Sequence, residues 1–204
     1  TEDHILLKGE AFDEEAELPV FYSTKQFTAV GLVYILKLFV HCVFNHNKPA
    51  LELAKTADCE NLIRAATGQY QPYFGLCFFA LALLQNDDHS TDSDKESCLN
   101  KAISIRDELG MYMKMIPNNF AMMHYLVSAD ICRIEGKALE AIELYDQAIS
   151  TSKENNYPHF EAIANELCAA VWVARGKGTI AERYLLDAYN AYKQWGCEPK
   201  CLQL

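Results

Sequence analysis

Apolar residues recur at helical spacing along most of the chain, with short polar breaks between the apolar runs. The segment 72–85 is apolar nearly all round, which predicts a central, buried helix. We find no run with the period-two alternation of a β-strand. The pattern therefore predicts an all-α fold, with helices over 23–45, 49–66, 72–85, 94–115, 120–135, 137–155, 158–175 and 178–196.

The ends of these segments carry helix-boundary signals. Ser23 with Gln26, and Ser93 with Glu96, have the spacing of a capping box, which predicts helix starts at both places. We expect three parts: an acidic N-terminal segment or partial helix at 1–22, a helical-repeat domain at 23–196, and a C-terminal tail at 197–204.

A set of small and large residues occurs twice in the C-terminal half with one constant offset of 40 residues. A fixed period of this size indicates stacked helical hairpins, each unable to bury its apolar face alone. The eight expected helices would then form about four antiparallel pairs in a superhelix. The matching residues are Ala129 and Ala169, Gly136 and Gly176, Ala141 and Ala181, Tyr145 and Leu185, and Ala148 and Ala188.

This order of small, small, large and small residues resembles the tetratricopeptide repeat, whose usual length is about 34 residues. The small residues would let the two helices of a pair approach closely. The match to the family pattern is partial. Tyr125 and Asn165 stand where the family most often has a large aromatic residue, and Lys153 and Lys193 stand near its expected proline.

Five stretches also resemble, in order, the helical-repeat region of very large hybrid signalling kinases. They are ALEAIELYDQAI, ANEL, ARGK, IAERYLLDA and YKQWG. Proteins of that family carry a serine/threonine-kinase-like domain, a P-loop ATPase domain, the helical repeats, a GAF domain and a histidine kinase. The resemblance implies that this chain is an internal, non-catalytic piece of such a kinase.

Composition narrows the range of partners. The net charge of −10 disfavours nucleic acid and anionic membrane surfaces. The longest apolar stretch, 30–44, is interrupted by Lys37 and His41 and is too short to span a bilayer. Several of the eight cysteines sit in apolar helical patterns, so we expect reduced thiols and a cytoplasmic location.

Several short motifs resemble nucleotide- or metal-binding sites, but a structural role explains each of them better. GKGT at 176–179 lacks the first glycine and the hydroxyl residue of a P-loop, and a helix end explains it. The remaining motifs lack the spacing of metal sites. They are His41 with His46, Cys197 with Cys201, and the acidic group Asp92, Asp94 and Glu96. We therefore predict no catalytic, cofactor-binding or metal-binding residue.

If the stacked pairs form a binding groove, the repeat register places Asp130, Arg133 and Glu166 on its concave side as partner contacts. The favoured hypothesis is a scaffold or regulatory module of a signalling kinase that contacts other domains or a protein partner. An alternative is a ligand- or peptide-binding sensor of an ATPase-coupled transcription regulator. A third is an all-α enzyme, which predicts converging titratable groups with shifted pKa values.

Overall fold

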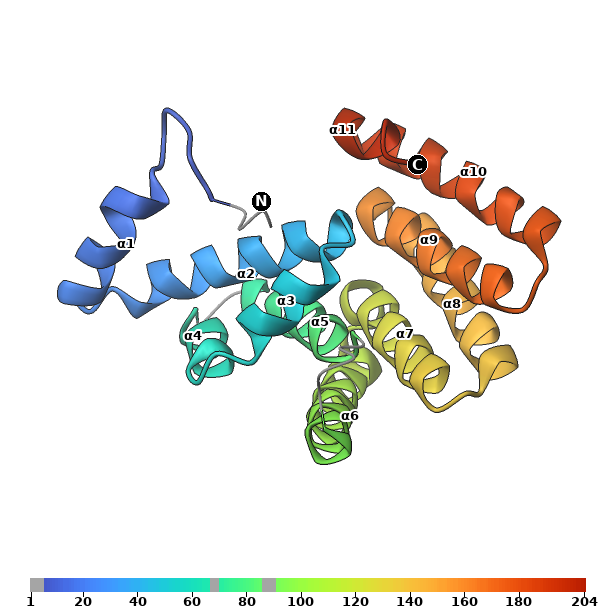
Figure 1. The fold of residues 1–204 in the computed structure, drawn as a ribbon, viewed down its shortest axis with the longest axis horizontal. Coiled ribbons are helices and arrows are strands. Elements are labelled where there is room, and N and C mark those ends of the chain that lie inside the picture. The colour runs from blue at the N-terminus through green and yellow to red at the C-terminus, as the bar shows by residue number, and fades with distance from the viewer. Residues whose placement is uncertain (1–5, 67–69, 86–90) are drawn as a thin grey trace. The chain divides into compact units, whose positions relative to one another are not determined.

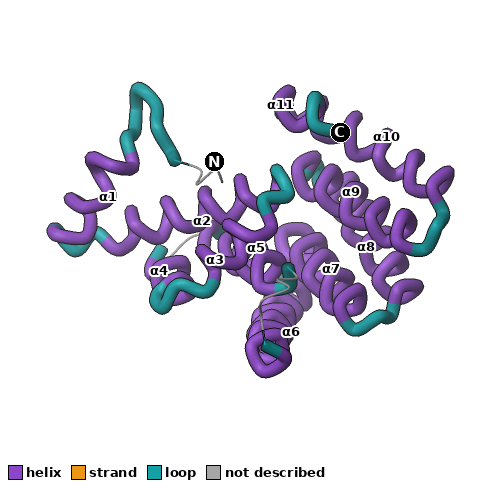
Figure 2. Tube along the Cα trace, viewed as in Figure 1, coloured by secondary structure: helices purple, strands orange, loops and turns teal. Residues whose placement is uncertain are grey.

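The computed structural model describes residues 6–66, 70–85 and 91–204, and these residues are mainly helical (Figures 1 and 2). Within them there is no β-strand, and Lys8 and Asp13 form one isolated antiparallel bridge. The helices are α1 (Glu14–Ser23), α2 (Phe27–Val43), α3 (Asn47–Ala54), α4 (Cys59–Ala65), α5 (Gln71–Leu83), α6 (Asp92–Met115), α7 (Pro117–Ile134), α8 (Ala138–Glu154), α9 (Pro158–Ala174), α10 (Gly178–Trp195) and α11 (Glu198–Cys201).

The all-α prediction is confirmed, and the chain divides into two compact units at Thr1–Cys98 and Leu99–Leu204. The boundary falls inside α6, which starts in the first unit and ends in the second. Each unit has its own set of packed helices.

The first unit is organised around α5, which contacts α2, α3 and α4. Nearly every residue from Pro72 to Leu83 is buried, so the predicted central helix is confirmed. Helix α2 also packs so closely on α4 at Gly31 that any Cβ there would clash with the Leu62 carbonyl.

Two of the expected helix boundaries in this unit are wrong. Ser23 does not start a helix: it is the last residue of α1, and α2 begins at Phe27. The single helix expected at 49–66 is two helices, α3 and α4. The break covers residues 55–58 and includes Thr56, whose hydroxyl donates to the Leu53 carbonyl and so competes with continued helical bonding.

Side chains cap the starts of α1 and α6, and neither cap was predicted. Asp13 accepts hydrogen bonds from the backbone N–H groups of Glu15 and Ala16, which starts α1 within the part of the chain expected to be an acidic segment or a partial helix. The predicted cap at Ser93 is wrong by two residues. Thr91 and Asp94 form the reciprocal cap instead, with the Asp94 N–H donating to the Thr91 hydroxyl at 3.2 Å.

The second unit contains two helix pairs, α7–α8 and α9–α10, in which each helix contacts the next (Figure 1). The alanines of the 40-residue pattern are buried in this unit. The alanines at 129, 141, 148, 169, 181 and 188 are all at most 1% exposed. Close approach of the helices therefore depends on the absence of larger side chains there.

Left-handed residues end these helices at a regular interval of 20. In the second unit they are Gly136, Asn156, Gly176 and Gly196, and in the first unit Lys25 and Asn45. At each one, the next residue's N–H bonds back to a carbonyl five residues earlier, as when Lys177 donates to Trp172. These are Schellman caps. The helix-end explanation of GKGT at 176–179 is thereby confirmed.

The C-terminal residues are more ordered than a tail. The left-handed cap at Gly196 is followed two residues later by α11, as the cap at Asn156 is followed by α9. Helix α11 therefore begins 40 residues after α9. It packs on α10 and contributes one fully buried side chain, Lys200.

Candidate functional site

Asp130, one of the predicted groove residues, lies in the interior of the α7–α8 pair and has no exposed surface. The Tyr145 hydroxyl donates to its Oδ1 at 2.7 Å. The Arg133 guanidinium donates to both carboxylate oxygens, at 2.6 and 3.1 Å. A buried carboxylate needs such partners because desolvation of an isolated charge is costly.

The electrostatics of this cluster raise the pKa values of Tyr145 and Arg133. Burial raises the pKa of Tyr145, and the adjacent Asp130 carboxylate raises it further. Burial acts to lower the pKa of Arg133, but the Asp130 carboxylate outweighs it and the pKa is raised. The geometry thus gives Asp130 and Arg133 an internal structural role, and their contact with a partner stays a prediction.

Glu166, the third predicted groove residue, belongs to a different internal network. It accepts a hydrogen bond from the Tyr192 hydroxyl at 2.9 Å and one from the Lys200 ammonium at 2.7 Å. Lys200 also donates to the Gln203 side chain at 3.1 Å and lies 5.7 Å from the centre of the Tyr192 ring. This network fastens α11 to α9 and α10.

The 40-residue register shows that the charged residues of this network replace apolar residues of the preceding helix pair. Glu166 and Lys200 correspond to Leu126 and Phe160 of the preceding pair, and those two apolar side chains are at most 1% exposed. The interface before α9 is therefore hydrophobic, and the equivalent interface before α11 contains a buried ion pair. The repeat register singled out Glu166 as a groove residue, but it predicted neither Lys200, in the segment expected to be a tail, nor this exchange.

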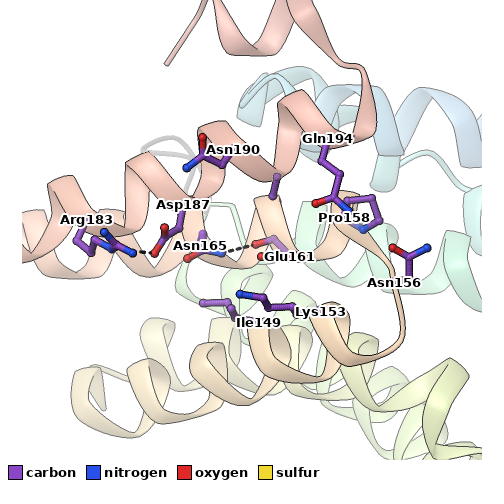
Figure 3. A pocket seen from close by; sticks show the side chains of 11 residues that line it. Ile149, Lys153, Asn156, Pro158, Glu161, Asn165, Arg183, Asp187, Asn190 and Gln194 are labelled. Carbon is purple, nitrogen blue, oxygen red and sulfur yellow. Dashed lines mark hydrogen bonds and ion pairs between the residues drawn. The ribbon is translucent and has the colours of Figure 1, made fainter.

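A pocket of about 430 Å³ lies between α8 and α10, with α9 between them (Figure 3). Its volume is within the range of small-ligand sites. Its lining is mostly polar and includes none of the three predicted groove residues. The lining residues are Ile149, Lys153, Asn156, Pro158, Glu161, Asn165, Arg183, Asp187, Asn190, Ala191 and Gln194.

The pocket is balanced in charge. Lys153 on α8 and Arg183 on α10 are basic, and Glu161 on α9 and Asp187 on α10 are acidic. Arg183 and Asp187 form an exposed ion pair at 3.1 Å. Burial raises the pKa of Glu161, Lys153 lowers it and Asp187 raises it, with burial the largest contribution. The carboxylate therefore sits in a partly desolvated position.

Asn165 is a pocket residue with a smaller side chain than its counterpart one repeat earlier. It corresponds in register to Tyr125, and both occupy the place of the large aromatic residue in the tetratricopeptide pattern. Asn165 is 2% exposed, and its amide donates to the Glu161 carbonyl at 2.8 Å. An amide in place of a ring leaves space beside it. Sequence reasoning noted this substitution without connecting it to a pocket.

The other motifs considered for chemistry show no assembled site. In the described part of the chain, no three His, Cys, Asp or Glu side chains are grouped so that they could hold a metal ion. All eight cysteines are free thiols, and burial raises the pKa of Cys59 and of Cys168 to about 12. Asp92, Asp94 and Glu96 lie at the start of α6. No helix among the described residues has both the length and the apolarity to cross a membrane.

No protein-family model matches the chain. Over 55 residues, it is 34% identical to hybrid signal transduction histidine kinase G of Dictyostelium discoideum. The match covers 27% of this chain and only 2% of that much longer protein. The similarity supports a relation to part of a signalling kinase.

Proposed function

We propose that this chain is a tetratricopeptide-like scaffold or regulatory module of a multidomain signalling kinase, without catalytic activity of its own. It contacts other domains of the same polypeptide or a protein partner. The observation that carries the proposal is the regular recurrence of the helix pairs. Left-handed caps stand 20 residues apart and buried alanines 40 residues apart. Stacked helix pairs of this kind commonly serve as extended binding surfaces.

The similarity to a hybrid signal transduction histidine kinase supports the signalling part of the proposal. The interior of the second unit supports the non-catalytic part. The buried Asp130 there pairs with Arg133 and Tyr145, and this internal pairing stabilises the contact between α7 and α8.

The mass of the native polypeptide tests the multidomain part. An antibody raised against residues 99–204 should detect a band several times the 23.1 kDa mass of this chain in immunoblots of source cells. The purified chain should show no ATP hydrolysis or autophosphorylation under conditions in which the intact protein does. A native band near the chain's own mass would contradict the kinase context, and activity of the purified chain would contradict the scaffold role.

The pocket between α8 and α10 favours a second candidate function, a ligand-binding sensor. A ligand that binds only the folded chain raises its melting temperature. A thermal-shift screen of metabolites and short peptides should therefore yield a compound that stabilises the chain in a dose-dependent manner. No stabilisation by any compound would remove this second function and leave the scaffold role untouched.

A further inference from the structure

We propose that the pocket lined by Lys153, Glu161 and Asn165 binds a small zwitterion, a free amino acid or a dipeptide. The proposal rests on the ligand-binding function suggested above for this pocket. It is independent of the scaffold role. It adds the chemical class of the ligand and the contact made by each charged group.

The first argument is the arrangement of charge. Lys153 on α8 and Glu161 on α9 both line the pocket (Figure 3). Lys153 is close enough to lower the pKa of Glu161, yet in the described chain neither side chain forms an ion pair within 4.0 Å. A carboxylate and an ammonium group near each other but not joined can each accept a partner of opposite charge. A ligand with an ammonium group for Glu161 and a carboxylate for Lys153 satisfies both.

The second argument is the chemistry of the remaining lining. Four side-chain amides surround the pocket: Asn156, Asn165, Asn190 and Gln194. Amides both donate and accept hydrogen bonds, so they suit the peptide bond of a dipeptide or a polar side chain. The ion pair of Arg183 and Asp187 lies on the side of the pocket formed by α10 and limits the size of a ligand on that side.

The same lining disfavours other ligand classes. A hydrophobic ligand would leave the amides and charges desolvated without partners, which is costly. A phosphate-like dianion would meet the Glu161 and Asp187 carboxylates as well as the two cations. A segment inside a longer peptide carries no terminal charges for Lys153 and Glu161.

The test is isothermal titration calorimetry on the whole chain. The probes are the twenty L-amino acids and diglycine, each compared with its N-acetylated, C-amidated form. At least one free probe should bind, and blocking both of its termini should weaken binding about tenfold or more, since charge-assisted hydrogen bonds are lost. Binding of a blocked form with equal affinity would overturn the zwitterion assignment.

Variants locate the site. Lys153→Gln and Glu161→Gln should each weaken binding about tenfold. Asn165→Tyr should abolish it by restoring the ring that Tyr125 supplies one pair earlier. Lys193→Gln is the matched control, because Lys193 is exposed, corresponds to Lys153 in register and is absent from the pocket lining. Affinities unchanged in Lys153→Gln and Glu161→Gln would place the ligand elsewhere.

The outcomes separate this proposal from the functions above. If no zwitterion binds while the thermal-shift screen finds a ligand of other chemistry, the sensor function stands and the ligand class is wrong. If Asn165→Tyr does not fold, as judged by circular dichroism, the variants at the exposed Lys153 and the half-buried Glu161 still decide the question.

Discussion

At the scale of single residues, the most unusual side chain is Lys200, a lysine with no exposed surface that lies near the end of the chain. Lysine is almost never fully buried unless it is paired. Here its ammonium group pairs with Glu166 at 2.7 Å. Removing one partner of a buried pair usually costs about 3–5 kcal/mol, because the other charge remains desolvated.

We predict a smaller cost at this site. Lys200→Met should lower the free energy of unfolding by about 1–3 kcal/mol, because α11 is short and terminal and can separate to hydrate Glu166. Urea denaturation measures the loss, and hydrogen exchange should show faster exchange in α11. The double variant Glu166→Leu with Lys200→Phe copies Leu126 and Phe160 and should recover most of the stability. An unfolding free energy for Lys200→Met equal to that of the exposed control Lys193→Met would contradict this assignment.

His159 provides a second residue-level prediction, on pH. Burial against Phe160 and Trp195 lowers its pKa to about 4 from the usual 6.5. Below pH 6.5 the unfolded chain therefore takes up a proton that the folded chain refuses. Stability should fall as the pH drops from 6.5 towards 4, by at most roughly 3 kcal/mol from this group.

Urea denaturation of the native chain and of His159→Phe between pH 7.5 and 4 measures this contribution. The variant should lose less stability than the native chain over that interval, and the two should show the same slope above pH 7, where the histidine is neutral in both states. Equal losses below pH 6.5 would show that His159 does not carry the effect.

At the scale of helices, the turns give the second unit its period. A left-handed residue at each helix end directs the chain back along its neighbour, and glycine adopts that conformation without steric cost. Gly176 has a φ of +70°, whereas Gly178, two residues later, starts α10 with an ordinary backbone. A Cβ would meet no atom within 4 Å at either position, so only backbone preference separates them.

We therefore predict opposite effects for two neighbouring substitutions. Gly176→Ala should destabilise the chain by about 1 kcal/mol, because the left-handed conformation is unfavourable for alanine. Gly178→Ala should stabilise it by about 0.5–1 kcal/mol, because alanine is the better helix former. Thermal or urea unfolding of both variants checks the pair. A stabilising Gly176→Ala would show that this turn does not hold its left-handed cap.

Helix boundaries were predicted most accurately where the local sequence carries strong helix-end signals. Between residues 92 and 196 the helix boundaries agree within about three residues, since prolines, glycines and a sustained apolar period define each end. Helix α11 lies in the segment expected to be a tail. In the first unit the break between α3 and α4 at Thr56 and the cap at Thr91 were missed, because several polar residues nearby could serve as caps.

The candidate site was harder to predict than the helices. The helical register correctly brings Asp130 beside Arg133, three residues apart on one face. It could not show that Tyr145 buries that pair, or that Lys200 reaches Glu166 from 34 residues away. The pocket depends on three helices together and on the missing ring at Asn165, which is a property of packed side chains and not of a periodic pattern.

At the scale of the whole molecule, the chain consists of two units of different construction. The second unit repeats with a 40-residue period, whereas the first surrounds the almost wholly buried helix α5. Because most contacts lie within each unit, each has an apolar core of its own. When a substitution destabilises one of two such cores, its unit unfolds as a separate cooperative region.

This organisation predicts how two matched core substitutions differ. Leu38 in α2 and Leu126 in α7 are both fully buried, so replacing either with alanine should cost about 2–5 kcal/mol in its own unit. Native-state hydrogen exchange should show lost protection in α5 for Leu38→Ala and in α9 for Leu126→Ala, with the other unit unchanged. Loss of protection across both units from either substitution would mean that they unfold as one. The helix pairs would then depend on the first unit for their stability, and a signal arriving at either unit could reach the other through the shared folding equilibrium.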